Sequence, residues 1–290
     1  MMISEEQLRG LLTYEALMPA IREALRAYSA GRVAMPLRTV VYVKEHAGWF
    51  ASMPAVYGNV MGAKLVTFYS GNAALGLPTH LATIQLLDAV TGAPLATIDG
   101  RLITEMRTAA VSAVAVDLLA GADARVLAIL GSGVKARSNV AALALVRGFE
   151  EIRVWSRTPG NAERFASEAG GTSMSAEAAV TGADVVLTLT AASEPVLQGR
   201  WLKPGAFVCA VGSVTPERRE LDALAMSGPK VVESREAAAV EAAISDCVEL
   251  GELLNGAVLE RNGYPVVFKS LGVAVSDIAA AKLVYELSRR

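Results

Sequence analysis

The chain has 290 residues, 53% of them apolar and 19% charged, which suits a folded globular protein of one large or two moderate domains. Its net charge of −2 and pI near 5.9 give no electrostatic case for binding nucleic acid or an anionic membrane surface. The mean hydropathy is +0.39, but no run of about 18 apolar residues lacks a charge or turn signal, so we expect no transmembrane helix. Glu5 and Glu6 stand where a secretory signal would be basic, which favours a cytoplasmic protein.

The first third of the chain predicts a helix followed by a sheet. Ser4 and Gln7 resemble a capping box, and a helix is expected over 14–30. Strands are expected at 37–43, 48–53, 63–69 and 80–88, separated by Pro and Gly residues that include Pro54. Residues 88–95 predict a hairpin, so this region should form a sheet domain of its own.

The next helix opens on an unfavourable cation. Thr104 is a good N-cap and Glu105 suits the first turn, but Arg107 takes the third helical position, where it opposes the helix dipole by roughly 0.3–1 kcal/mol. A substrate carboxylate or a cofactor pyrophosphate would turn this position into a binding site, and we favour that interpretation. The alternative is an ion pair with a local acid such as Asp99 or Glu105.

Two further cations interrupt β-rich runs. Lys64 lies in an apolar run, where an unpaired ammonium is costly to bury and has its pKa lowered, as in a proton donor. The alternative is a strand-edge lysine that discourages aggregation. Arg38 also lies in a predicted strand, and an arginine there more commonly belongs to a solvent-exposed strand face than to a binding site. His80 fits a packed, hydrogen-bonded histidine as well as a site residue.

The most informative stretch is 126–136, where an aliphatic run leads into Gly-x-Gly-x-x-Ala and then into helix-compatible sequence over 137–146. Gly131 permits a sharp exit from the strand, Gly133 leaves room for a pyrophosphate, and Ala136 lets the helix pack closely. By itself the motif also fits an ordinary strand-to-helix turn. The expected dinucleotide contacts here are Gly131, Ser132, Gly133, Val134 and Lys135.

The following strand supports the dinucleotide site and indicates which cofactor it takes. Residues 151–155 predict a strand that ends at Ser156, Arg157 and Thr158, with no acid in place. An Asp or Glu at this point would bind the ribose 2′-OH of NAD, whereas an Arg with hydroxyl neighbours suits a 2′-phosphate. The sequence therefore predicts NADP(H) over NAD(H).

Later segments complete a Rossmann pattern. Further strands are expected at 183–190, 206–211, 230–233 and 266–270. Thr190 should line the cofactor, and Gly212 with Ser213 should lie near the nicotinamide. Cys209 and Cys247 are isolated thiols, which indicate neither a disulfide framework nor a metal site.

These segments together resemble the ornithine cyclodeaminase and mu-crystallin family. The resemblance rests on Met53-Pro54, Gly62 through Thr67, Gly76 through His80, Arg107 through Ala110, Gly131-Ser132-Gly133, Ser156-Arg157-Thr158, Val211-Gly212-Ser213, Arg219 through Asp222, Phe268 through Ala274, and Asp277. It covers nearly the whole chain.

The resemblance implies an α/β protein that forms a homodimer. Residues 1–118 with 271–290 would make an α+β substrate-binding and dimerisation domain, and residues 119–270 a doubly wound Rossmann domain that binds NADP(H). Active sites would lie in the cleft between the two domains.

The resemblance also assigns roles to residues. Arg38, Lys64 and Arg107 would be catalytic, holding the substrate carboxylate around the reacting carbon. We expect the substrate-binding set to be Arg38, Met53, Lys64, His80 and Arg107. Ser270 and Gly272 would border the nicotinamide, and Thr108 completes the expected cofactor contacts.

One departure from the family pattern bears on the reaction. Val214 stands where the cyclodeaminase branch has an Asp that acts on the substrate amine or on water. A valine cannot carry a proton, so the resemblance implies net reduction of cyclic α-imino acids by NADPH. Three alternatives remain: an NADP-dependent amino acid dehydrogenase or reductive aminase acting on 2-oxo acids, a lyase of the ornithine cyclodeaminase type, and a non-catalytic NADPH-binding protein.

Overall fold

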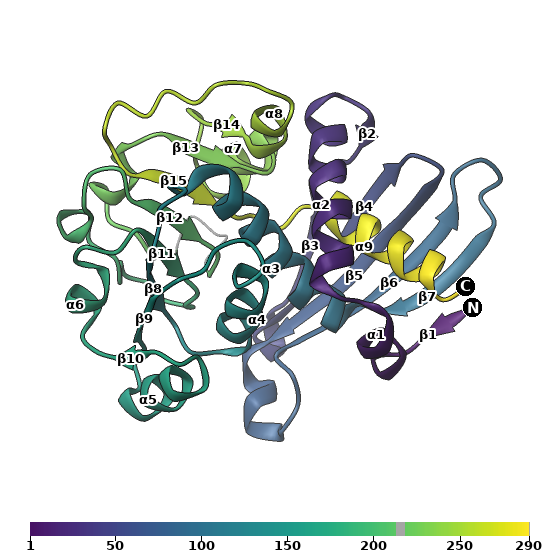
Figure 1. Ribbon diagram of the computed structural model, residues 1–290. Coiled ribbons are helices and arrows are strands. Elements are labelled where there is room, and N and C mark those ends of the chain that lie inside the picture. Colours follow the sequence, from purple (N-terminus) through teal and green to yellow (C-terminus); the bar gives the residue numbers. More distant parts are fainter. Residues whose placement is uncertain (213–217, 290) are drawn as a thin grey trace. The chain divides into compact units, whose positions relative to one another are not determined.

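The computed structural model describes residues 1–212 and 218–289 of the chain. The chain forms two compact units, the first from Met1–Arg107 and Gly272–Arg290 and the second from Thr108–Leu271. Figure 1 labels the elements of both. The domain boundaries expected after residues 118 and 270 stay predictions. The first of them falls inside helix α3 (Gly100–Leu119), which continues from one unit into the other.

The first unit is built on a mostly antiparallel sheet. Its strands are β1 (Met2–Ile3), β2 (Val33–Ala34), β3 (Thr39–Val43), β4 (Gly48–Tyr57), β5 (Val60–Tyr69), β6 (His80–Asp88) and β7 (Pro94–Asp99). Their order is β1-β7-β6-β5-β4-β2, and β3 also pairs with β4. Short 3₁₀ turns lie at Lys44–His46 and Ser70–Leu75. The strand expected over 80–88 and the hairpin that follows it are confirmed.

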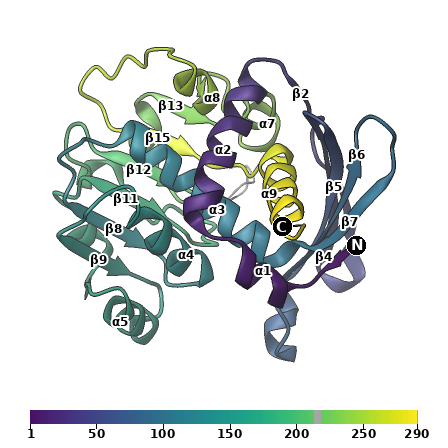
Figure 2. The ribbon, with the colours of Figure 1, turned by 45° about the vertical axis from the view of Figure 1, so that its right-hand side comes forward.

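Helices cover one face of this sheet. They are α1 (Glu5–Leu11), α2 (Tyr14–Ser29) and α9 (Ala274–Leu287). Helix α9 packs on β4, β5 and β6 with α2 beside it, as Figure 2 shows. Alternate residues of β4 face this helix layer and are buried, namely Ala51, Met53 and Ala55. The last helix therefore returns to the N-terminal sheet and completes its core.

The expectation that Pro54 separates two strands is wrong, because Pro54 lies inside β4. Strand β4 pairs with β3 as far as Ser52 and with β2 from Val56 onward. Pro54 falls between these two pairings, where that edge of β4 has no partner strand among the described residues. A residue without an N–H is tolerated at such a position.

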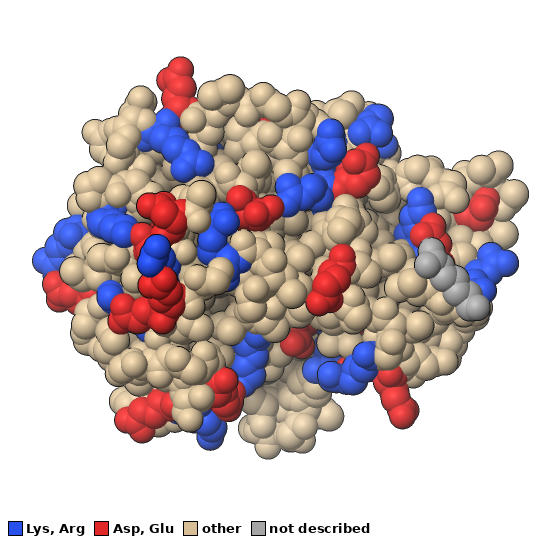
Figure 3. All heavy atoms as spheres, viewed as in Figure 1, with Lys and Arg blue, Asp and Glu red and all other residues tan. Residues whose placement is uncertain are grey.

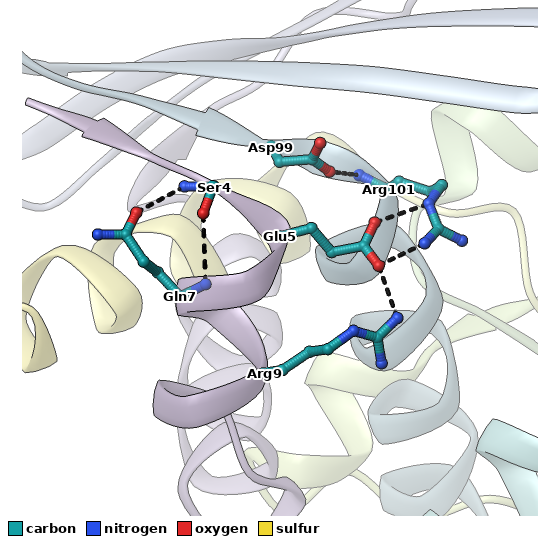
Figure 4. Close-up of polar contacts among 6 residues, drawn as sticks. All are labelled: Ser4, Glu5, Gln7, Arg9, Asp99 and Arg101. Carbon is teal, nitrogen blue, oxygen red and sulfur yellow. Dashed lines mark hydrogen bonds and ion pairs between the residues drawn. The ribbon is translucent and has the colours of Figure 1, made fainter.

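The expected start of the helix that carries Arg107 is also wrong. Helix α3 begins at Gly100 instead of after Thr104, and an Asp99 oxygen accepts the Arg101 N–H at 2.9 Å (Figure 4). A Cβ on Gly100 would lie 2.8 Å from the side chain of Ala82, so a glycine fits this close approach to the sheet. Arg107 is thus one turn further into the helix than expected, and the dipole argument for an anion does not hold.

The capping box expected at Ser4 and Gln7 is confirmed, and it opens α1. The Ser4 N–H donates to Gln7 Oε1 at 2.9 Å (Figure 4). Glu5, in the first turn, accepts hydrogen bonds from Arg101 at the start of α3 and from Arg9. Helix α1 is therefore tied to α3 by side chains 96 residues apart.

The second unit contains a parallel sheet. Its strands are β8 (Val126–Leu130), β9 (Glu151–Trp155), β10 (Thr172–Ser173), β11 (Val185–Thr188), β12 (Phe207–Ala210), β13 (Lys230–Val232), β14 (Val248–Glu249) and β15 (Val266–Lys269). The order is β10-β9-β8-β11-β12-β15-β13-β14. The chain winds outward from β8 in both directions, so the carboxyl ends of β8 and β11 form the switch point where such folds bind ligands.

Both faces of this sheet are covered, as in a doubly wound fold. The helices are the end of α3, α4 (Val134–Leu143), α5 (Pro159–Glu168), α6 (Ala176–Val180), α7 (Arg235–Glu241) and α8 (Leu250–Leu254), with 3₁₀ turns at Gly199–Trp201 and Ala225–Ser227. Ala128, Val186 and Val208 pack against α6 on one face. On the other face Cys209 meets Ser112 of α3, and burial raises the pKa of this thiol to about 12. Such a thiol is unreactive.

The surface and the helices add two observations. On the face shown in Figure 3, acidic and basic side chains are interspersed. Within residues 1–212 and 218–289, none of the helices has the length and apolar character needed to cross a membrane.

Candidate active site

A buried ion-pair cluster joins three elements of the first unit. Asp277, in the first turn of α9, lies between Lys64 of β5 and Arg107 of α3. Its Oδ2 is 2.8 Å from Lys64 Nζ, and its Oδ1 accepts a hydrogen bond from Arg107 Nε at 2.9 Å. The three side chains are at most 6% exposed. Lys64 and Arg107, which the sequence singled out independently, are thus brought together by one carboxylate.

The contact between Lys64 and Asp277 follows from the alternation of side chains between the two faces of β5. Gly62 and Lys64 face the same side of the sheet, and a Cβ on Gly62 would lie 3.1 Å from Ile278 of α9. The small residue lets α9 approach closely, which places Asp277, one residue before Ile278, within reach of the ammonium. Asp277 entered the sequence argument only as part of the family pattern. A lone acid within the apolar run 271–281 was the available signal, because buried acids are rare unless paired.

Arg107 has unused donor capacity. Its Nη1 is buried and has no acceptor among the described residues. The backbone of Gly272 packs against the guanidinium: a Cβ there would lie 3.0 Å from both Nη1 and Nη2. Gly272 also has a φ of +74°, so a side chain is excluded both by conformation and by space. This cradle leaves the guanidinium able to bind a small anion such as a carboxylate.

Arg38 is the third cation of the group. Its Nη2 donates to the carbonyl oxygen of Gly272 at 2.9 Å, and its charge acts on Lys64. The expectation of a solvated strand face is wrong for Arg38, which is only partly exposed and precedes the first residue of β3. The peptide of Gly272 therefore lies against both Arg107 and Arg38.

The surroundings of Lys64 lower the pKa of its ammonium group. Burial lowers the pKa of Lys64 to about 8; Asp277 opposes the shift, while Arg107 and Arg38 add to it. A strand-edge lysine is excluded, because β5 is paired on both sides by β4 and β6 and the side chain is 2% exposed. The alternative ion pair of Arg107 with Asp99 or Glu105 is replaced by the pair with Asp277.

Met53 and His80 differ in their relation to this cluster. Met53 is directly opposite Lys64 in the β4–β5 register and is buried on the same face. His80 is exposed at the start of β6, with its ring 4.7 Å from that of Phe68 and edge-on to Trp49. Its role in substrate binding stays a prediction.

The glycine turn of the second unit has the shape of a phosphate cradle. Gly131 has a φ of +131°, and a Cβ would lie 2.8 Å from the carbonyl oxygen of Leu189, so only glycine fits there. Gly133, the N-cap of α4, has open space where a Cβ would project, and no side chain caps the helix. Helix α4 begins with Val134 and Lys135, directly after the second glycine of the turn. The free space at a helix N-terminus suits a pyrophosphate.

The residues expected at a 2′-phosphate lie beside this turn. Ser132 Oγ donates to Ser156 Oγ at 2.8 Å, which joins the glycine turn to the end of β9. Arg157 is exposed and makes no hydrogen bond or ion pair with any described residue. Thr158 is the N-cap of α5, and its hydroxyl caps no N–H. These groups lie where the adenosine end of a dinucleotide is expected.

The other expected cofactor contacts lie along the carboxyl edge of the same sheet. Thr190 and Gly212 follow β11 and β12, and both are held by the carboxylate of Glu220. Glu220 entered the sequence argument only as part of the family pattern. Ser270 Oγ donates to Glu233 at 3.0 Å. Thr108 is buried in α3, and its carbonyl oxygen accepts a hydrogen bond from Ser112. Ser213 and Val214 lie outside the described residues.

Comparisons with known proteins cover the whole chain. The family model described as the ornithine cyclodeaminase/mu-crystallin family matches residues 1–290. The ketimine reductase mu-crystallin of Mus musculus is 44% identical over 298 residues, covering 98% of this chain and 95% of that protein. The structure of Thermococcus litoralis Δ1-pyrroline-2-carboxylate reductase in complex with NADH and L-proline is 33% identical, with a TM-score of 0.92 and coverage of 99% and 97%. An archaeal alanine dehydrogenase dimer with bound NAD is 28% identical, with a TM-score of 0.94 and coverage of 99% and 95%.

Proposed function

The chain belongs to the ornithine cyclodeaminase/mu-crystallin family, and from this premise we propose that it is an NADPH-dependent reductase of cyclic α-imino acids. Its substrates would be ketimines of the Δ1-pyrroline-2-carboxylate and Δ1-piperideine-2-carboxylate type, reduced at C2 to L-proline and L-pipecolate. The relatives named as a ketimine reductase and a Δ1-pyrroline-2-carboxylate reductase support this substrate class.

The observation that carries the proposal is the buried cluster in which one carboxylate lies between the two cations Lys64 and Arg107. Holding charges in a protein interior costs several kcal/mol unless they are fully compensated. Asp277 supplies one negative charge against the two positive charges of Lys64 and Arg107, and Arg107 Nη1 has no acceptor among the described residues. A substrate carboxylate would supply the missing negative charge and the missing acceptor. In this role Arg107, assisted by Arg38, fixes the carboxylate and with it the orientation of C2.

Reduction of a C=N bond needs a hydride on carbon and a proton on nitrogen. The reduced nicotinamide supplies the hydride when bound. Lys64 supplies the proton to the imine nitrogen, or holds the iminium in register, because burial keeps its pKa at about 8 and the group gives up a proton readily near neutral pH. Asp277 holds the ammonium in place from the side of α9.

The cofactor would bind at the carboxyl edge of the parallel sheet. Gly131, Ser132, Gly133, Val134 and Lys135 would hold the pyrophosphate, and Ser156, Arg157 and Thr158 the 2′-phosphate. Thr108, Thr190, Gly212, Ser213, Ser270 and Gly272 would border the rest of the dinucleotide. The solved neighbours carry NADH and NAD, so the choice of NADPH rests on Arg157 and on the lack of an acid at the end of β9.

A homodimer is proposed from the open face of the first sheet. Val41, Phe50, Leu65 and Leu81 share the face opposite α9 by register, and each is between 36% and 55% exposed. Several large apolar side chains exposed on one sheet face indicate an interaction site. A second copy of this chain is the proposed occupant, in line with the neighbour described as a dimer. A cytoplasmic location stays a prediction from the sequence.

The test of function is a steady-state screen that follows loss of NADPH absorbance. The purified chain is given the two cyclic imines, pyruvate with ammonia or methylamine, and ornithine. We expect the highest kcat/KM with a cyclic imine and an L-amino acid as product. Faster turnover of pyruvate with an amine would instead indicate a dehydrogenase or reductive aminase. Ammonia release from ornithine without net NADPH loss would indicate a lyase, and NADPH binding without any turnover would contradict an enzyme.

The cofactor assignment has its own test. Arg157→Ala should weaken NADPH binding by roughly tenfold or more, since one charge-assisted contact to the 2′-phosphate is lost, and should leave NADH binding unchanged. Arg164→Ala, on the following helix α5, is the matched control at an exposed arginine. Equal kcat/KM of the parent protein with NADPH and NADH would contradict the assignment.

A further inference from the structure

Glu220 is a buried carboxylate that holds two neighbouring loops of the second unit. It is 2% exposed. Its Oε1 accepts the backbone N–H of Thr190 at 2.7 Å and the hydroxyl of the same residue at 2.8 Å. Its Oε2 accepts the backbone N–H of Gly212 at 2.8 Å. One side chain therefore fixes the backbone that follows β11 and the backbone that follows β12.

The main chain of Glu220 is fixed as well. Its carbonyl oxygen accepts the N–H groups of Val196 and Leu197, both at 2.9 Å. A Cβ on Gly212 would lie 2.4 Å from Glu220 Oε1 and 2.1 Å from the carbonyl oxygen of Thr190. Gly212 is thus a position where the absence of a side chain lets the carboxylate reach the backbone.

Glu233 repeats this arrangement two strands further along the sheet. It is 1% exposed, and it accepts the hydroxyl of Ser270 at 3.0 Å and the N–H of Leu271 at 2.8 Å. Glu233 directly follows β13, whereas Ser270 and Leu271 follow β15. Each glutamate therefore ties together two loops at the carboxyl edge of the sheet.

Lys269 lies between the two glutamates. It is the last residue of β15, paired in register with Ala210 of β12 on one side and Val232 of β13 on the other. Burial lowers the pKa of Lys269, while the charges of Glu220 and Glu233 oppose this shift. The charges of the two buried carboxylates thus act on one partly buried cation.

We infer that Glu220 and Glu233, with Lys269 between them, are positioning residues that set the backbone bordering the nicotinamide half of the cofactor. The inference rests on the proposed function, since Thr190, Gly212 and Ser270 are its proposed cofactor contacts. A carboxyl group with two acceptor oxygens is required, because both oxygens of Glu220 accept hydrogen bonds. A glutamine would turn its amide NH₂ toward one of these N–H groups.

The test compares the binding of whole NADPH with the binding of its adenosine half, 2′,5′-ADP. Glu220→Gln should weaken NADPH binding by roughly tenfold, because the replaced oxygen leaves a donor facing a donor, and should leave the affinity for 2′,5′-ADP unchanged. Both affinities are measured by calorimetry on the full chain. Asp222→Asn is the matched control: Asp222 accepts the backbone N–H groups of Gly199 and Ala225, away from the proposed cofactor contacts, and its variant should bind both ligands as the parent does.

The outcomes distinguish this inference from the proposed function. A parent protein that binds neither NADPH nor 2′,5′-ADP would overturn the proposed function itself. A parent that binds NADPH, together with a folded Glu220→Gln variant of unchanged NADPH affinity, would overturn the positioning role. Equal weakening of both ligands would also overturn it, since that is the mark of a general folding role. If Glu220→Gln does not fold, Glu233→Gln undergoes the same pair of measurements with the same expectation.

Discussion

At the scale of single residues, the protein is dominated by one acid among three cations. Lys64 and Arg107 share the carboxylate of Asp277, and Arg38 donates to the carbonyl oxygen of Gly272 beside them. Burial and the two arginines keep the pKa of Lys64 near 8, well below its usual range. The cluster is therefore set up both to bind an anion and to release a proton close to neutral pH.

The first prediction concerns the pH dependence of reduction. The protonated form of Lys64 is the donor, so kcat/KM should fall as the pH rises through about 8, the pKa of the free enzyme. Arg107→Gln and Arg38→Gln each remove a charge that lowers this pKa, so both should move the break to higher pH, Arg107→Gln by more. A pH profile of kcat/KM measures this. A break at the same pH in Arg107→Gln would remove Lys64 from the proton transfer.

A second prediction concerns stability. Asp277→Asn leaves two buried cations uncompensated and should lower the free energy of unfolding by about 3–5 kcal/mol. Lys64→Met in the same background should restore part of this loss, because one of the stranded charges is removed. Urea unfolding of the parent, the two single variants and the double variant gives the coupling. Additive effects would show that the ion pair contributes nothing specific.

At the scale of elements, the start of α1 follows from a local signal. The capping box of α1 is formed as expected, but α1 is also tied to α3 through Glu5 and Arg101 (Figure 4). Burial raises the pKa of Glu5, but the hydrogen bonds from Arg101 and Arg9 outweigh this, and the pKa is lowered overall.

The third prediction tests this tie. Because the pKa of Glu5 is lowered in the folded protein, its stabilisation is present above the unfolded value of 4.5 and is lost as the pH falls through the folded value. Glu5→Gln should therefore lower stability at neutral pH by about 0.5–1 kcal/mol, given the partial exposure of the pair, and the difference should shrink in acid. Thermal unfolding at several pH values measures it, with Glu6→Gln as the control. A difference that persists in acid would assign the effect to packing.

At the scale of the whole molecule, the first sheet has one face covered by helices and one face with exposed apolar residues. Helix α9 buries Ala51, Met53 and Ala55, whereas Phe50 and Leu65 point to the opposite face by the alternation of the strands. In a protein of ordinary surface composition, such a face is the expected site of self-association.

The fourth prediction concerns assembly. Phe50→Glu and Leu65→Lys together should convert a dimer to a monomer, because charges would be buried without partners in the interface. Sedimentation velocity measures the mass of the particle. Val258→Glu, at an exposed apolar position of the second unit, is the control and should leave the mass unchanged. A parent that sediments as a monomer at micromolar concentration would contradict the dimer.

The sequence by itself determined the local features. Strand β8, the glycine turn and strand β9 were predicted with their bounds, because an aliphatic run and a following glycine motif are visible in the local sequence. Lys64 could also be singled out, since an ammonium is unfavourable in an apolar run. Arg107 was singled out on a helix start that the structure does not have. The continuation of β4 through Pro54 could not be predicted, because β2 and β3 decide it through pairing with another element. The start of α3 does have a local signal, since Asp99 directly precedes the helix and accepts the Arg101 N–H, but Thr104 was predicted as the cap instead.

Only the tertiary structure decided which groups meet. Asp277 reaches Lys64 and Arg107 because the last helix returns to the first sheet, and 170 residues separate Asp277 from Arg107 along the chain. Glu220 and Glu233 likewise gained a role only when the parallel strands brought the ends of β11, β12, β13 and β15 to one edge. Local sequence patterns can show that a buried charge needs a partner, but the partner is chosen by the packing of elements far apart in the chain.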